Sequence, residues 1–300
     1  MSTLPVIAAV DGSDDSLRAL DWAVDAARRR TAPLRVVHVR QYAAWNDTGV
    51  PLAPAPDPDG DPVLDEVRRH LDGIAHLPET DYLALAGTPA ALLPELGPTA
   101  QLLVLGSRGR GGFASLLLGS NGMAAARDAD CPVVVVPPAG REVHGDEPAE
   151  PGPRVVVGVK VDSPDEASLD FAFAEAARRD ARVQAVAAYT WPVQTWATPG
   201  QLLPPCVDQN AIEQETRTLA EEALTPYRDR YRTVRADAVA APGDAAGHLV
   251  AASRDATLVV VGRHHRRLLA PARLLGSVTQ AVLLHAASPI AVIPPTPETP

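Results

Sequence analysis

The residues best suited to chemistry in this sequence are glycines that follow a short apolar run. Gly106 and Gly109 come directly after Gln101–Leu105, and Gly119 with Ser120 stands ten residues beyond Gly109. Glycine lets backbone N–H groups approach an anion without a Cβ in the way. The residues after Ser120 are typical of a helix start, where unpaired N–H groups and the helix dipole favour negative charge. A strand, a glycine loop and a helix start together predict a phosphate-binding site.

Glycine-rich turns also occur where nothing binds, so the spacing of the glycines has to be compared with known phosphate motifs. No Gly-x4-Gly-Lys-Ser/Thr occurs, which excludes a P-loop. No Gly-x-Gly-x-x-Gly follows the first apolar run, so the dinucleotide fingerprint is also excluded. Arg108 and Arg110 flank Gly109 and could neutralise phosphate or face solvent. The Ser120 hydroxyl could cap the helix or donate to a phosphate oxygen.

The elements that must position these residues alternate along the first half of the chain. Hydrophobic periodicity predicts strands at 6–10, 34–39, 81–85, 101–105 and 133–136, and helices at 16–30, 61–77, 87–96 and 120–128. Such alternation predicts an α/β fold, a parallel sheet with helices on both faces. Ligands of such sheets bind beyond the carboxyl ends of the strands, where Asp11 and the glycine loop would both lie.

The same pattern then starts again. Strands are predicted at 154–159, 183–189, 234–239, 258–261 and 290–293, with a helix near 208–230. Gly262 and Gly276-Ser277 repeat Gly106 and Gly119-Ser120. The stretch between the halves is rich in Gly, Pro, Glu and Asp and reads as a linker. We therefore predict two tandem domains, 1–140 and 154–300, joined by a linker at 141–153.

Composition restricts the partners and the compartment. The 300 residues are 46% hydrophobic, which is typical of a globular protein, and no run approaches the roughly 18 apolar residues of a membrane helix. A net charge of −10 argues against a nucleic-acid partner. The first residues lack the features of a signal peptide, so a cytoplasmic location is expected. Cys131 and Cys206 lie in different halves and suggest neither a disulfide framework nor a metal cage, and Cys131 is expected to be buried.

The spacing Gly106-x2-Gly109-x9-Gly119-Ser120 matches the nucleotide-binding signature of the universal stress protein family, and the whole chain resembles a tandem member of it. The resemblance implies a five-stranded parallel sheet in each half, with ATP, with or without Mg²⁺, between the first and fourth strands. By position, it implies that Asp11 meets the adenosine and Val39 lines the adenine pocket. It also implies that Gly106 and Gly109 border ribose and phosphates, and that Gly119, Ser120 and Asn121 hold the phosphate tail. The other implied site residues are Ala9, Gly87, Leu105 and Arg108.

The second half departs from this signature. An ungapped match puts Lys160 at the position of Asp11, whereas a shift of one residue puts Val161 there. His265 replaces the second glycine. The cluster 264–267, His-His-Arg-Arg, could attract an anion, but it also fits a solvated basic turn, and no third ligand supports a metal site. We therefore expect one ATP per chain, in the first half.

Three functions remain open from the sequence. The first is an ATP-binding regulatory protein of the stress-response type, and the second is slow ATP hydrolysis or self-phosphorylation. The glycine loop has no lysine, placed base or carboxylate pair for Mg²⁺, which disfavours catalysis. The third is an interaction scaffold without ligand, its protein partners unknown. Trp45, Trp191 and Trp196 lie in predicted loops, as ligand lids or as packed loop cores.

The last strand of each half bears on assembly. Family members usually dimerise through antiparallel contact of their last strands. Here 133–136 and 290–293 are both apolar and followed by prolines, and an exposed apolar edge strand invites aggregation. We predict that the two strands pair within one chain as an internal pseudo-dimer. A further homodimer stays open.

Overall fold

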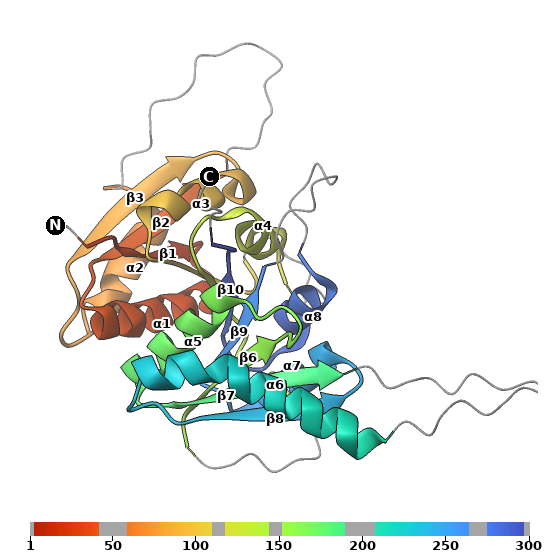
Figure 1. The fold of residues 1–300 in the computed structure, drawn as a ribbon. Coiled ribbons are helices and arrows are strands. Elements are labelled where there is room, and N and C mark those ends of the chain that lie inside the picture. The colour runs from red at the N-terminus through yellow and green to blue at the C-terminus, as the bar shows by residue number, and fades with distance from the viewer. Residues whose placement is uncertain are drawn as a thin grey trace, which may run out of the picture.

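The computed structural model describes residues 3–41, 59–109, 118–143, 152–189, 208–263 and 275–296. Its strands form one sheet of ten strands in the order β3-β2-β1-β4-β5-β10-β9-β6-β7-β8 (Figure 1). The strands are β1 (Val6–Val10), β2 (Leu34–Arg40), β3 (Thr80–Ala86), β4 (Leu102–Gly106), β5 (Val133–Val136), β6 (Arg154–Val159), β7 (Arg182–Tyr189), β8 (Ala236–Pro242), β9 (Leu258–Gly262) and β10 (Ile290–Ile293). The α-helices are α1 (Asp14–Arg30), α2 (Pro62–Leu71), α3 (Pro89–Glu95), α4 (Ser120–Asp128), α5 (Glu166–Arg179), α6 (Gln209–Arg230), α7 (Ala245–Ala252) and α8 (Ser277–His285).

The helices divide between the two faces of the sheet and close a separate core on each. Side chains of a strand alternate between faces, so the eight inner strands contribute to both cores. One core lies under α1, α2, α5 and α6, with Leu20, Leu64 and Phe173 fully buried in it. The other lies under α3, α4, α7 and α8 and contains Leu103 and Leu283. The α/β fold with a predominantly parallel sheet that the sequence predicts is confirmed.

The two halves meet at β5 and β10, which pair antiparallel with Val135 opposite Ile290. All other neighbouring strands pair in parallel. The predicted internal pseudo-dimer is thereby confirmed in the arrangement of the strands. Helices α1 and α5 also meet across this seam (Figure 1). There Arg30 of α1 pairs at 2.8 Å with Glu175 of α5, and both side chains are almost fully buried.

Some element ends differ from the sequence prediction for local physical reasons. Helix α2 ends at Leu71 rather than near residue 77, because Gly73 follows and glycine is a poor helix former. Strand β8 starts at Ala236 and continues to Pro242, because it keeps its parallel register with β7 as far as Tyr189. Proline is tolerated there because β8 is an edge strand.

Several residues singled out from the sequence lie outside the described ranges: Trp45, Arg110, Trp191, Trp196, Cys206 and the cluster 264–267. Cys131 is buried as expected, at 4% exposure, and burial raises the pKa of its thiol to about 11. Within the described ranges, no helix combines the length and the hydrophobicity needed to cross a membrane.

Candidate functional site

A pocket lies in the first half at the point where the order of the strands in the sheet reverses. Strand β1 has β2 on one side and β4 on the other, so the connections that leave β1 and β3 run over opposite faces and leave a crevice beyond the strand ends. The pocket there takes in about 540 Å³ of space, part of which is open solvent. Its lining comes from β1, β2, β4, α1, α3, α4 and the loops after β1 and β4: Ala9, Val10, Asp11, Ser16, Val37, Val39, Pro89, Leu93, Leu105, Gly106, Ser107, Arg108, Gly109, Gly119, Asn121 and Gly122.

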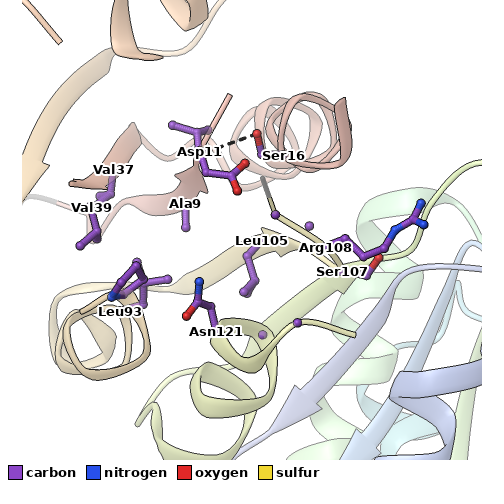
Figure 2. Close-up of a pocket in the computed structure, with 16 residues that line it drawn as sticks. Ala9, Asp11, Ser16, Val37, Val39, Leu93, Leu105, Ser107, Arg108 and Asn121 are labelled. Carbon is purple, nitrogen blue, oxygen red and sulfur yellow. Dashed lines mark hydrogen bonds between the residues drawn. The ribbon is translucent and has the colours of Figure 1, made fainter. Parts of the chain in front are cut away.

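One end of the pocket is apolar, and the strand register explains its shape. Ala9 lies directly beside Val37 on one neighbouring strand and Leu105 on the other. Because Ala9 is smaller than both, the middle of this row is hollow. Val39 lies two residues beyond Val37 on the same face, and Leu93 of α3 closes the hollow from above the sheet (Figure 2). This end of the pocket suits a flat apolar group.

Asp11 stands at the rim of this hollow and is held in place by the turn that follows it. Its Oδ1 accepts hydrogen bonds from the Ser13 backbone N–H at 3.0 Å and from the Ser13 hydroxyl at 2.6 Å. Gly12 has φ +77°, a conformation that side chains disfavour, so glycine is required for this turn. A Cβ on Gly109 would overlap the other carboxylate oxygen, so the glycine loop passes directly over Asp11.

The other end of the pocket is built from glycine backbone and the start of α4. A Cβ on Gly106 would lie 2.7 Å from the Asp15 carbonyl oxygen, so β4 ends tightly packed against α1. The Gly119 N–H donates to the Ser107 carbonyl oxygen at 2.7 Å. Gly119 is the N-cap of α4, and among the described residues no side-chain hydrogen bond caps this helix. Of the two roles open to Ser120, capping is therefore wrong, because the chain enters the helix one residue earlier.

An ion-pair cluster borders the pocket beside Ser107. Asp15 is buried at 7% exposure and accepts from Arg108 Nε at 3.1 Å, from the Ser107 hydroxyl at 3.4 Å and from Arg18. Figure 2 shows the Arg108 guanidinium directed away from Asp11 and from the apolar end. The pKa of Arg141 is lowered, mainly by burial and further by the charge of Arg108, while Asp15 opposes this. Arg18 and Arg108 are thus paired with the Asp15 carboxylate beside the glycine end of the pocket.

The structure brings most of the predicted site residues together. Those that line the pocket are Ala9, Asp11, Val39, Leu105, Gly106, Arg108, Gly109, Gly119 and Asn121. Gly87 and Ser120 do not line it. Sequence reasoning missed Val37, Leu93 and Asp15. The alternation of strand β2 could have identified Val37, because it shares a face with Val39. The spacing of the glycines gives no sign of Asp15, which lies in the first turn of α1, two residues after the N-cap Ser13.

In the second half, a different residue occupies the position that corresponds to Asp11. Val6 of β1 lies opposite Leu102, the first residue of β4. In the second half, Val155 of β6 lies opposite Leu258, the first residue of β9, so Val155 is the counterpart of Val6. This register equates Lys160 with Asp11 and decides the alternative that the sequence left open. The Lys160 side chain is exposed and pairs with Asp162 at 3.3 Å.

Two side chains of the second half pack closely against glycines at the ends of its strands. Leu249 of α7 is 1% exposed and packs on Gly158, the counterpart of Ala9, with its Cδ1 3.0 Å from the position of a glycine Cβ. The Asp165 carboxylate occupies the space beside Gly262. The Thr279 hydroxyl donates to the Gly262 carbonyl oxygen at 2.9 Å. Among the described residues of either half, no group of three or more His, Cys, Asp or Glu side chains is arranged to hold a metal ion.

Comparison with known proteins agrees with this architecture. The profile of the universal stress protein family matches residues 4–137 and again residues 153–294. The chain belongs to the universal stress protein family. Universal stress protein Rv2005c of Mycobacterium tuberculosis is 34% identical to it over 96% of both chains. The crystal structure of a universal stress protein from Archaeoglobus fulgidus, 15% identical, shares the fold with a TM-score of 0.61 over 99% of this chain and 98% of that one. A universal stress protein crystallised with cAMP is 26% identical and covers 45% of this chain and 98% of its own, with a TM-score of 0.34.

Proposed function

We propose that this universal stress protein is a regulatory protein that binds one ATP in its first half. The observation that carries the proposal is the order of groups along the pocket. An apolar hollow at Ala9, a fixed carboxylate at Asp11 and a glycine-lined helix start at Gly119 follow one another at the carboxyl ends of β1 and β4. That order fits adenine, ribose and phosphates in turn.

Each part of the ligand has a physical reason to lie where the proposal puts it. Adenine fits the hollow because its faces are apolar, and Val39 and Leu105 are almost fully buried around it. Asp11 accepts hydrogen bonds from ribose hydroxyls, which a carboxylate does well. The N-terminus of α4 offers backbone N–H groups and the positive end of a dipole to phosphate, with Arg108 close by.

The second half supports the site in this proposal and takes no nucleotide of its own. Leu249 packs directly on Gly158, where the first half has Ala9, and Lys160 replaces the carboxylate, so the same ligand would lose the polar partner that Asp11 offers. The proposed division is a binding domain, 1–140, a linker, 141–153, and a companion domain, 154–300. We propose that the protein acts in the cytoplasm, where ATP is abundant.

Titration calorimetry of the full chain tests the proposal. ATP, ADP, AMP and GTP are titrated with and without Mg²⁺, and nucleotide released from the freshly purified protein is identified by mass spectrometry. We expect one ATP per chain and weaker binding of AMP, because AMP lacks the phosphates that would reach α4. Absence of ATP binding by nucleotide-free protein would overturn the proposal, and two ATP per chain would overturn the assignment to one half.

A further inference from the structure

Helix α4 is held at its two ends by residues that are counterparts in the two halves. The Ser107 N–H donates to Val136 at the end of β5, and the Arg263 N–H donates in the same way to Ile293 at the end of β10. Ser107 and Arg263 therefore occupy equivalent positions. The Ser107 carbonyl oxygen accepts from Gly119 at the start of α4. Arg263 reaches the other end of the same helix.

The contact of Arg263 crosses from the second half into the first. Its Nη1 donates to the carbonyl oxygens of Arg127 at 2.8 Å and Ala129 at 2.6 Å, which lie at the C-terminal end of α4. The residue is 8% exposed. The last carbonyl groups of a helix have no partner within it and carry the negative end of its dipole, so a buried guanidinium there stabilises the helix.

We propose that Arg263 is a positioning residue for the nucleotide site of the other half. It does not line the pocket, but it fixes the helix whose first turn, at Asn121 and Gly122, does. This inference rests on the proposed function. The inference gives the second half a role in nucleotide binding. Ser107 and Arg263 occupy equivalent positions, but Ser107 lines the pocket whereas Arg263 holds the C-terminal end of α4.

The physical reason is that α4 is a short helix whose side chains toward the core are small. It is nine residues long, starts at a glycine N-cap that has no side chain of its own, and presents small residues, Ala124, Ala125 and Ala126, to the core. Short helices are marginal without tertiary contacts. Loss of the guanidinium leaves two carbonyl groups near the seam without their donor, and the last turn loosens. Phosphate binding at the first turn then has to restore order to the helix, which lowers affinity.

The test compares ATP affinity and melting temperature of full-length variants by calorimetry. Arg263→Gln removes the charge and the forked donor. The matched control is Arg154→Gln, because Arg154 is also buried and donates at 2.8 Å to the last carbonyl of a helix, Ala252 of α7, but within the second half. Arg141 caps α8 from across the seam in the same way, but it lies close to Arg108 and is less suitable as a control.

We expect Arg263→Gln to weaken ATP binding at least threefold and Arg154→Gln to leave it unchanged at a similar loss of melting temperature. Arg263→Lys keeps the charge without the fork and should fall between Arg263→Gln and the wild type. Should Arg263→Gln fail to fold, the lysine variant decides, with a loss of about twofold expected. Wild-type affinity in the folded Arg263 variants, or an equal loss in Arg154→Gln, would overturn the inference. Failure of the wild type to bind ATP would instead refute the proposed function.

Discussion

Gly109 lies directly against Asp11, so that a side chain on Gly109 would overlap the Asp11 carboxylate. The backbone of Gly109 is not in the left-handed region, so its conformation alone would accept alanine. The glycine is required because the loop crosses the carboxylate. Asp11 cannot move away freely, because Ser13 holds its other oxygen through two hydrogen bonds.

Gly109→Ala should therefore cost both stability and ATP affinity. The added methyl group displaces either the loop or the Asp11 carboxylate, and overpacking of this kind costs roughly 1–3 kcal/mol. The Asp11→Ala background is the control, because the methyl group then has room. Thermal unfolding of the four proteins measures the coupling: a stability loss for Gly109→Ala that is as large in the Asp11→Ala background would contradict the contact.

Gly119→Ala tests the phosphate end without this conflict. Gly119 has φ −75°, and the nearest atom to an added Cβ is the Ser107 carbonyl oxygen at 3.6 Å, an ordinary contact. The fold should accept the change, whereas a phosphate against the backbone should not. We expect at least a tenfold loss of ATP affinity, about 1.4 kcal/mol, with only a small loss of melting temperature in the absence of nucleotide, because alanine is a poorer N-cap residue than glycine.

Gly276→Ala is the matched control for this variant, because Gly276 is the N-cap of α8 with φ −62° and is the counterpart of Gly119. It should bind one ATP with wild-type affinity. If the two variants lose affinity equally, the site cannot be assigned to the first half.

Sequence reasoning reached the fold because its signals are local and repeated. Apolar strand runs, helical periodicity and proline boundaries recur in both halves. The apolar character of β5 and β10, together with the resemblance to the family, predicted their pairing. The place of the pocket was predicted from the rule that ligands of parallel sheets bind beyond the carboxyl ends of the strands, where Asp11 and Gly106 lie. Their roles toward a nucleotide came from the resemblance to the family and stay a prediction. Contacts between distant residues were out of reach: Leu249 on Gly158 and Arg263 on α4 depend on packing across the sheet and the seam, which no spacing encodes.

Asp11→Asn should weaken ATP binding less than Gly119→Ala does. The amide oxygen of asparagine can still accept from Ser13, so the turn is kept, but hydrogen bonds to a charged acceptor are stronger than those to a neutral one. We expect a three- to tenfold loss, about 0.7–1.4 kcal/mol. Calorimetry with ATP and with adenosine separates the effects, because the loss should be the same for both if Asp11 acts on the adenosine end. A loss confined to ATP would place Asp11 near the phosphates instead.

Asp61 gives a prediction about pH that does not depend on the nucleotide. The side chain is fully buried and caps α2 through hydrogen bonds from Val63 and Leu64, while His38 Nδ1 lies at 2.7 Å and Arg40 Nε at 2.8 Å. Burial alone would raise the pKa of Asp61, but the hydrogen bonds with His38 and Arg40 lower it from 3.8 to about 2. The folded state thus binds the proton less well than the unfolded chain.

The stability that Asp61 contributes is therefore fully present above pH 3.8 and is lost as the pH falls toward 2. Asp61→Asn retains a capping oxygen but loses the charge that faces Arg40, and should lower the free energy of unfolding by about 1–3 kcal/mol at pH 7. Denaturant unfolding of both proteins from pH 7 to pH 2 measures the difference, which should shrink below pH 4 as the wild-type carboxylate is protonated. ATP affinity at pH 7 should not change, because His38 lies on the face of β2 opposite to Val37 and Val39. A stability difference that stayed constant down to pH 2 would show that the Asp61 charge does not stabilise the fold.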